Sequence, residues 1–454
     1  MHTLSSLRAG QLAGIKRLDL SCGLTDFPRE IFELAESLEI LNLSGNDLSS
    51  LPDDLPKLHK LRVIFCSNNS LTEVPEVLGQ CANLEMVGFK ANKIRSVPAA
   101  SLPNKLRWLI LTDNQISTLP SELGACLHLQ KLMLAGNQLQ DLPLQMAACT
   151  RLELLRISAN RFSQLPEWLL SLPRLAWLAY AGNPCSDANE AAVMAKQAIR
   201  NIDWNSLELQ HPLGEGASGV IYRANHRLTG IDSPVAVKLF KGTLTSDGLT
   251  RSEKAACIAA GTHSGLIPVI GKISGHPENI PGLVMSLIDQ SFRNLAQSPS
   301  LESCTRDCYP VENRFTLTTT LNISLRIVEV AAHLHARGVM HGDLYAHNIL
   351  CNEQGNCLLG DFGAASFIPQ DDVRQSTGLQ CIEVRAFACL LEELLDRCDS
   401  MLKSQHVFDS IRTLQRRCAQ PEVNERPLFD EIQSELKVIE QLYIVQLCEN
   451  DKPD

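Results

Sequence analysis

The chain has 454 residues, which is more than one hydrophobic core organises and predicts two or three domains. Hydrophobic residues make up 44% and charged residues 20%, values typical of globular rather than disordered proteins. The formal net charge of −10 argues against nucleic acid or an anionic membrane surface as the main partner.

The termini, the apolar runs and the cysteines together predict a cytoplasmic protein. The first eight residues lack the apolar core of a signal peptide, and no run of about 18 apolar residues would span a membrane, so a membrane receptor is excluded. The 16 cysteines are neither closely nor regularly spaced, so we expect reduced thiols rather than a disulfide framework. Cys304 and Cys308 resemble half of a zinc site, but no second pair lies nearby, and we interpret them as loop thiols.

Residues 1–184 repeat with a period near 23 residues. Seven asparagines recur at intervals of 22 or 23, and aliphatic residues precede each of them, as in Leu106-Leu109-Leu111 before Asn114. The pattern resembles the leucine-rich repeat, L-x-x-L-x-L-x-x-N. This resemblance implies an α/β repeat solenoid in which each repeat contributes one short strand and one convex segment. The asparagines are Asn46, Asn69, Asn92, Asn114, Asn137, Asn160 and Asn183.

The variable positions on the expected concave strand face form two columns that are rich in apolar and aromatic residues. Such rows mark a protein-binding surface more often than a catalytic site, which predicts a protein partner or protein substrate there. Alternatively, part of this stripe packs against the second domain, and both interpretations stay open. The columns are Asn42, Phe65, Gly88, Ile110, Met133, Arg156 and Ala179, and Ile40, Val63, Met86, Trp108, Lys131, Leu154 and Trp177.

Residues 185–205 interrupt the period and predict a capping or linker helix from Asp187 to Ile202. Several alanines together with Ile199 give this segment helix propensity and an apolar side. Because no Gly/Ser-rich or Pro-rich tether is present, a fixed relationship between the domains is favoured.

Residues 206–454 open with a glycine-rich stretch that contains G-x-G-x-x-G. In dinucleotide-binding folds this motif opens a helix, but here strand-like runs follow, ending at Val235 to Lys238. We interpret the stretch as a hairpin whose glycines let backbone N–H groups approach nucleotide phosphates. The residues expected to bind the nucleotide are Leu213, Gly214, Glu215, Gly216, Ala217, Ser218, Gly219, Val220 and Ile221.

Two further motifs resemble those of the protein kinase family. His341-Gly342-Asp343-Leu344, with Asn348, resembles H-R-D-L-x-x-x-N, and Asp361-Phe362-Gly363 begins thirteen residues after that Asn. Either motif alone is weak, but together they follow the glycine-rich stretch and Val-Ala-Val-Lys at the spacing of the family. The chain thus resembles a leucine-rich-repeat-containing protein kinase, which implies an α+β bilobal domain over residues 206–454.

The resemblance implies a role for each polar residue of these motifs. Asp343 would orient the acceptor hydroxyl and accept its proton. Lys238, held by Glu253, would contact the α- and β-phosphates of ATP. Asn348 and Asp361 would coordinate Mg²⁺.

The sequence also departs from the family pattern. Gly342 replaces the Arg of H-R-D, so we do not expect control by activation-loop phosphorylation. Tyr345 stands where Ser/Thr kinases usually carry Lys, and His347 where many tyrosine kinases carry Arg, so the acceptor type stays open. No A-P-E precedes the helix that contains Glu383, which predicts an abbreviated floor for peptide docking. Met285 would lie at the gate of the adenine pocket.

Three functions compete on the sequence alone. The leading one is a protein kinase that transfers the γ-phosphoryl group of ATP to a Ser or Thr hydroxyl. The second is a small-molecule phosphotransferase of the aminoglycoside or choline type, which also carries H-G-D, but the attached repeats argue against it. The third is a scaffold that binds nucleotide without turnover, against which the complete set of ionic residues argues.

Overall fold

The structure is a computed structural model that describes residues 2–228, 231–399 and 405–450. The chain divides into two compact units. The first comprises Met1–Leu175 with Asn183–Cys185, and the second comprises Ala176–Gly182 with Ser186–Asp454. Within the described residues, none of the helices combines the length and the hydrophobicity that a bilayer-spanning segment needs.

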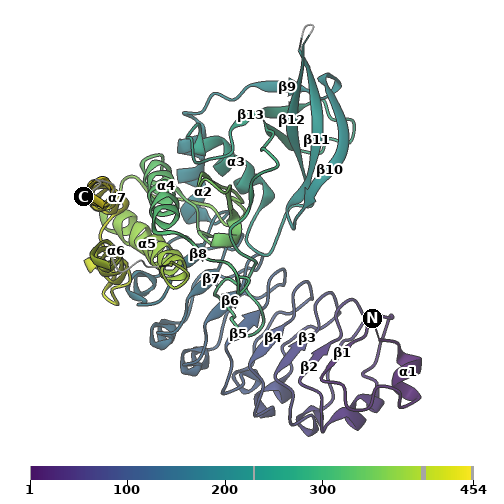
Figure 1. Cartoon of the computed structure of the whole chain (residues 1–454). Coiled ribbons are helices and arrows are strands. Elements are labelled where there is room, and N and C mark those ends of the chain that lie inside the picture. Colours follow the sequence, from purple (N-terminus) through teal and green to yellow (C-terminus); the bar gives the residue numbers. More distant parts are fainter. Residues whose placement is uncertain (1, 229–230, 400–404, 451–454) are drawn as a thin grey trace. The chain divides into compact units, whose positions relative to one another are not determined.

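The first unit is a leucine-rich-repeat solenoid, which confirms the prediction from the asparagine period (Figure 1). Its three-residue strands pair in parallel, each with the next along the chain. The elements are helix α1 (Leu4–Arg8) and strands β1 (Arg17–Asp19), β2 (Ile40–Asn42), β3 (Val63–Phe65), β4 (Met86–Gly88), β5 (Trp108–Ile110), β6 (Lys131–Met133) and β7 (Leu154–Arg156).

The repeated asparagines hold consecutive turns of the solenoid together. The Nδ2 of Asn137 donates to the carbonyl oxygens of Leu111 (2.9 Å) and Leu134 (3.0 Å), and its Oδ1 accepts from the backbone N–H of Ile116 (3.0 Å). The side chain therefore satisfies backbone groups that the turn leaves without partners in a buried place. Asn69, Asn92, Asn114, Asn160 and Asn183 make equivalent bonds.

Short 3₁₀ helices form the opposite side of each repeat. Six of the seven begin directly after a proline, whose fixed φ suits the approach to a helix. They are η1 (Arg29–Leu34), η2 (Leu55–Lys57), η3 (Glu76–Gln80), η4 (Ala99–Ser101), η5 (Ser121–Ala125), η6 (Leu144–Ala148) and η7 (Glu167–Ser171).

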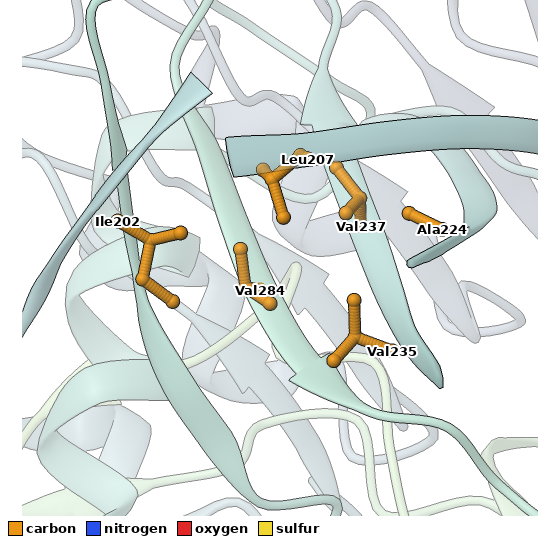
Figure 2. Close-up of a cluster of buried hydrophobic side chains, with 6 residues drawn as sticks. All are labelled: Ile202, Leu207, Ala224, Val235, Val237 and Val284. Atoms are coloured by element: carbon orange, nitrogen blue, oxygen red, sulfur yellow. The ribbon is translucent and has the colours of Figure 1, made fainter. Parts of the chain in front are cut away.

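The second unit contains a six-stranded sheet in the order β10-β11-β12-β14-β13-β9. All its neighbours are antiparallel except β13 and β9. Apolar side chains from five of the strands meet in one buried cluster (Figure 2), made of Ile202, Leu207, Ala224, Val235, Val237 and Val284. The strands are β9 (Asn201–Asp203), β10 (Leu207–Glu215), β11 (Gly219–Leu228), β12 (Ile231–Phe240), β13 (Val269–Ser274) and β14 (Gly282–Ser286), with η8 (Trp204–Ser206) between the first two.

The helix that the sequence predicts over residues 187–202 is shorter in the structure. Helix α2 spans Pro184–Met194, and the chain then leaves the helical path to form β9. Ile202 is only 2% exposed in the sheet core, and its strand pairs with β13. Burial and strand pairing outweigh the helix propensity of the alanines, which is a weak preference.

The remainder of the second unit is mainly helical, with small sheets between the helices, so the predicted α+β architecture is confirmed. Helix α4 packs against α7, and α5 packs against α6. The elements are β8 (Trp177–Ala179), α3 (Thr250–Ala260), β15 (Arg293–Asn294), α4 (Leu317–Ala336), β16 (Val339–Met340), η9 (Ala346–Asn348), β17 (Ile349–Cys351), β18 (Cys357–Leu359), β19 (Ser366–Phe367), α5 (Val373–Leu395), α6 (Gln405–Cys418), η11 (Val423–Glu425) and α7 (Phe429–Asn450).

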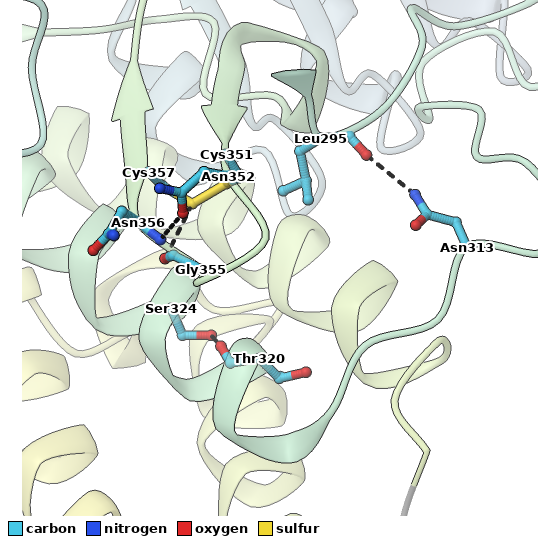
Figure 3. Close-up of a disulfide and its surroundings, with 9 residues drawn as sticks. All are labelled: Leu295, Asn313, Thr320, Ser324, Cys351, Asn352, Gly355, Asn356 and Cys357. Atoms are coloured by element: carbon cyan, nitrogen blue, oxygen red, sulfur yellow. Dashed lines mark hydrogen bonds between the residues drawn. A yellow bond between two sulfur atoms is a disulfide. The ribbon is translucent and has the colours of Figure 1, made fainter. Parts of the chain in front are cut away.

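The β17–β18 hairpin carries a disulfide between Cys351 and Cys357 (Figure 3). The two residues stand opposite one another in register, with their Cα atoms 4.3 Å apart. The expectation of reduced thiols is therefore wrong for this pair. Sequence spacing alone did not reveal it, because the pairing depends on the hairpin that brings the two strands together.

Candidate active site

The glycine-rich stretch forms the predicted hairpin, with β10 and β11 on either side of Gly216 to Ser218. The backbone N–H of Gly216 donates to the carbonyl oxygen of Gly219 (2.9 Å). A Cβ on Gly219 would lie 2.3 Å from the carbonyl oxygen of Leu239, so this position requires glycine. A Cβ on Gly214 or Gly216 would meet nothing within 4 Å, which leaves open space beside their backbone.

Lys238 on β12 and Glu253 on α3 form a hydrogen-bonded ion pair, as the sequence predicts. Their side chains are 13% and 1% exposed. Burial by itself lowers the pKa of Lys238, but the Glu253 carboxylate counteracts burial, and the net effect is a raised pKa. The lysine therefore keeps its positive charge inside the domain.

Lys238 and Glu253 face a cavity of about 80 Å³ that Asp361 also lines. Met285, the residue predicted at the gate of the adenine pocket, and Phe362 also line this cavity. Lys238 of the six-stranded sheet and Asp361, which follows β18, thus line the same cleft, although 123 positions separate them in the sequence.

Asp343 and Asn348 are joined directly within the loop that follows β16. The Nδ2 of Asn348 donates to the Asp343 carboxylate oxygen Oδ2 (2.8 Å) and to the Asp343 carbonyl oxygen (2.9 Å). The carbonyl oxygen of Asn348 accepts from the N–H of Gly360 (2.9 Å), the residue before Asp361. The structure therefore joins Asp343 to Asn348, and it joins Asn348 through the backbone to Gly360, which lines the cavity together with Lys238 and Asp361.

Glu383 of α5 anchors the start of this loop, a role that sequence reasoning did not assign. Its Oε1 accepts from the N–H of Gly342 (2.7 Å), and its Oε2 lies 2.7 Å from Nε2 of His335. Burial tends to raise the pKa of this carboxyl, but the bond from His335 and further positive neighbours bring it below its ordinary value of 4.5. The signal that could have revealed Glu383 is an acidic residue inside the apolar run from Ile382 to Ala388.

The two residues that depart from the family pattern in this loop are both engaged with protein groups. Tyr345 is 4% exposed and stacks on Trp177 of β8, with ring centroids 4.1 Å apart. His347 contacts Asp307 through its backbone N–H (2.9 Å) and its Nδ1 (2.7 Å). Burial opposes protonation of His347, but Asp307 raises its pKa above the ordinary value. Sequence reasoning missed Asp307, which lies 40 residues from His347.

Comparison with known proteins agrees with this geometry. Residues 207–397 match the protein tyrosine and serine/threonine kinase family, and residues 36–94 match the leucine-rich repeat. The chain contains a protein kinase domain. All the polar residues predicted for catalysis, metal binding and phosphate contact lie within the matched kinase domain.

Several relatives of the kinase domain carry serine/threonine kinase names. The serine/threonine-protein kinase-transforming protein mos of Myeloproliferative sarcoma virus is 31% identical over 180 residues, which are 39% of this chain and 51% of the relative. The proto-oncogene serine/threonine-protein kinase mos of Mus musculus is 30% identical over 181 residues, with the same two shares. A putative serine/threonine-protein kinase, L673, of Acanthamoeba polyphaga mimivirus is 25% identical over 208 residues, 44% of this chain and 33% of the relative. The chain spans about half the length of the mos relatives.

Proposed function

We propose that the kinase domain transfers the γ-phosphoryl group of ATP to a serine or threonine hydroxyl of a protein. The observation that carries this proposal is the direct bond between Asp343 and Asn348, beside a cleft that Lys238, Glu253 and Asp361 share. A proton acceptor, a phosphate-binding cation and two oxygen ligands for a metal are the parts that phosphoryl transfer needs. The names of the relatives support Ser/Thr as the acceptor class.

The residues present fit ATP with a magnesium ion. Because Nδ2 of Asn348 bonds to Asp343, the amide oxygen remains for a cation, and the Asp361 carboxylate supplies a second hard oxygen ligand. The open backbone at Gly214 and Gly216 suits phosphate oxygens, as does the charged Lys238. When bound, Mg²⁺ would neutralise phosphate charge and orient the phosphates.

Asp343 then has two tasks at the acceptor. The bond from Asn348 fixes the orientation of the Asp343 carboxylate, which would accept a hydrogen bond from the acceptor hydroxyl. The hydroxyl proton passes to this carboxylate as the oxygen attacks the γ-phosphorus and the bond to the β-phosphate oxygen breaks. The fixed geometry, rather than covalent chemistry by the protein, would supply most of the rate.

An assay with labelled ATP, Mg²⁺ and a generic protein acceptor tests the proposal. We expect label on the acceptor or on the protein itself, and a loss of at least about 100-fold in kcat for Asp343→Asn, because a general base contributes about that factor. Lys238→Met should also remove activity, whereas Lys272→Met, on β13 of the same sheet, serves as the matched control that keeps it. Label found only on small hydroxyl compounds would instead indicate a small-molecule phosphotransferase, and Mg²⁺-dependent ATP binding without turnover would indicate a scaffold.

We further propose that the strand face of the repeats recognises a protein partner or the protein substrate. In the first unit, Phe65, Trp108 and Ile110 are partly exposed along this face, and the Nζ of Lys131 lies 4.3 Å from the centre of the Trp108 ring. Exposed aromatic groups beside a cation are typical of protein-binding sites.

Substrate profiling in a cell lysate tests the role of this face. Trp108→Ala should remove a subset of the labelled proteins while kcat on a generic acceptor stays unchanged. Leu144→Ala, which truncates a 69% exposed side chain on η6, is the control and should leave the labelled set intact. An identical labelled set for both variants and the wild type would contradict substrate recognition by the strand face.

A further inference from the structure

Strand β8 belongs to the compact unit that contains the kinase domain, although its sequence continues the leucine-rich pattern. Trp177 of β8 is 2% exposed and lies nearly parallel to the Tyr345 ring, with 7° between the planes. Its Nε1 donates to the carbonyl oxygen of Leu344 (3.2 Å). Leu344 and Tyr345 directly follow Asp343, so this single side chain supports the catalytic loop at two consecutive residues.

The residues after β8 hold a second catalytic segment. The backbone N–H groups of Tyr180 and Ala181 both donate to Oγ of Ser366, at 2.9 and 3.1 Å. The phenolic hydroxyl of Tyr180 donates to the carbonyl oxygen of Phe367 (3.0 Å). Ser366 and Phe367 form β19, which follows Asp361-Phe362-Gly363 and pairs with β16 just before His341.

The backbone of β8 also explains the unusual glycine of the catalytic loop. Gly342 has a φ of +72°, and a Cβ there would lie 2.6 Å from the carbonyl oxygen of Leu178 and 2.5 Å from that of Ala364. A side chain at this position is therefore incompatible with the place that β8 occupies. The position of β8 therefore explains why residue 342 is glycine and not the arginine of the family pattern.

We propose that Trp177 is a positioning residue for phosphoryl transfer, supporting the catalytic loop through Tyr345 and Leu344 while Tyr180 holds the segment after Asp361. The contacts of Trp177 with Leu344 and Tyr345 lie in the catalytic loop, so the residue acts on the reaction through that loop. This inference rests on the proposed kinase activity. It assigns to the repeat-derived strand a part of the catalytic geometry that the domain matched at residues 207–397 does not itself contain.

A positioning role has a kinetic signature that a general structural role lacks. Under the proposed function, Lys238 and the glycine hairpin hold the nucleotide. Both belong to the six-stranded sheet, of which β8 is not a member. Loss of Trp177 should therefore lower kcat and leave KM for ATP nearly unchanged, because misplacement of a catalytic group by about 1 Å costs up to about 100-fold in rate.

The experiment uses the full chain with Trp177→Leu, Trp177→Phe and the control Trp168→Leu, which removes a partly exposed tryptophan from η7. We expect Trp177→Leu to lower kcat at least about tenfold with less than about a threefold change in KM for ATP. Trp177→Phe keeps an aromatic face for Tyr345 and loses the N–H donor, so its kcat should lie about threefold below the wild type. Amide hydrogen exchange should become faster in peptides covering residues 341–351 and stay the same in those covering 213–221.

The outcomes separate this inference from the proposed function. A folded Trp177→Leu variant with kcat within twofold of the wild type overturns the inference, as does an equal loss in kcat and ATP binding. If the leucine variant does not fold, Trp177→Phe decides by the same criteria. If the wild type itself transfers no phosphate, the proposed function fails, and the exchange of residues 341–351 still tests the support of the loop. Unchanged exchange there in Trp177→Phe would overturn it.

Discussion

Gly342 occupies a position where a side chain has no room and where the backbone conformation favours glycine. We expect Gly342→Ala to lower the free energy of unfolding by about 3 kcal/mol, about 1 from the left-handed φ and about 2 from overpacking against two carbonyl oxygens. Gly355→Ala is the matched control, because its φ is also positive but its Cβ would meet nothing closer than 3.4 Å. Urea unfolding of both variants measures the difference, and equal losses would show that the close approach of Leu178 and Ala364 has no energetic effect.

The Glu383 carboxylate predicts a dependence of stability on pH. Its pKa is lowered in the folded state, so its contribution is fully present above the ordinary value of 4.5 and is lost as the pH falls through the folded value. The groups that face it are His335, His341 and the N–H of Gly342. We expect Glu383→Gln to cost about 2 kcal/mol at pH 7, because it weakens a buried charged hydrogen-bond network.

Thermal unfolding between pH 3 and pH 7 tests this dependence. The difference in Tm between wild type and Glu383→Gln should begin to shrink as the pH falls below about 4.5, where the carboxyl of the unfolded chain takes up a proton. It should be lost as the pH falls further, through the lower pKa of the folded state. Gln380→Glu, three residues earlier on α5, would add a carboxyl outside this network and serves as a control for nonspecific charge effects. A constant difference in Tm across the range would contradict the assignment of the titration to Glu383.

At the scale of elements, the β17–β18 hairpin connects Asn348 to Asp361 and is closed by the disulfide between Cys351 and Cys357. A cross-link over so short a loop stabilises the folded state by about 2 kcal/mol, chiefly by restricting the unfolded chain. We expect the double variant Cys351→Ser, Cys357→Ser to lose about 2 kcal/mol in the free energy of unfolding, with a matching decrease in Tm. A thiol reductant should destabilise the wild type but not the double variant. Mass spectrometry of alkylated protein would show two fewer reactive thiols in the oxidised wild type than in the reduced one.

Sequence patterns predicted the elements whose signal is local. The asparagine period gave the solenoid, and the strand-like runs after the glycine motif correctly distinguished a hairpin from a helix. The predicted extent of α2 was wrong because the sheet that Ile202 joins determines the conformation of this residue. The alanine-rich segment before it carries no information about that sheet. The disulfide escaped for a similar reason, since six residues of separation do not specify a cross-strand pair.

At the scale of the whole molecule, the site residues that could be predicted lie within recognisable sequence motifs. The residues that were missed contact the site from positions far away in the sequence. Lys238 and Asp361 lie in recognisable motifs and line one cavity, and Asp343, which also lies in a motif, bonds to Asn348. Trp177 lies 167 residues before its partner Leu344, inside a repeat whose leucine spacing gives it a different meaning. The sequence left open that part of the concave stripe packs on the second domain, and Trp177 packs on Tyr345, but the leucine spacing could not name its partners.

The family match to the kinase domain begins at residue 207, yet the compact unit that contains this domain also includes β8, most of α2 and β9. A piece covering residues 207–454 lacks Ile202, which is 2% exposed in the sheet core, and also Met194 and Ile199, which pack on a second cluster. Each buried aliphatic side chain contributes about 2 kcal/mol, and 1 kcal/mol corresponds to about 2–4 °C in Tm at this size. We therefore expect residues 207–454 to unfold at least about 5 °C below residues 176–454.

Point variants in the full chain separate this packing effect from the effect of cutting the chain. Ile202→Ala should lower the Tm of the transition that Mg·ATP would shift under the proposed function, because a ligand stabilises the unit to which it binds. Asn201→Ala, which truncates an exposed side chain on the same strand, should leave that Tm unchanged. If both variants have the Tm of the wild type and residues 207–454 and 176–454 unfold at the same temperature, β9 contributes nothing to the stability of the sheet. The functional boundary of the kinase domain would then coincide with the family match instead of beginning before it.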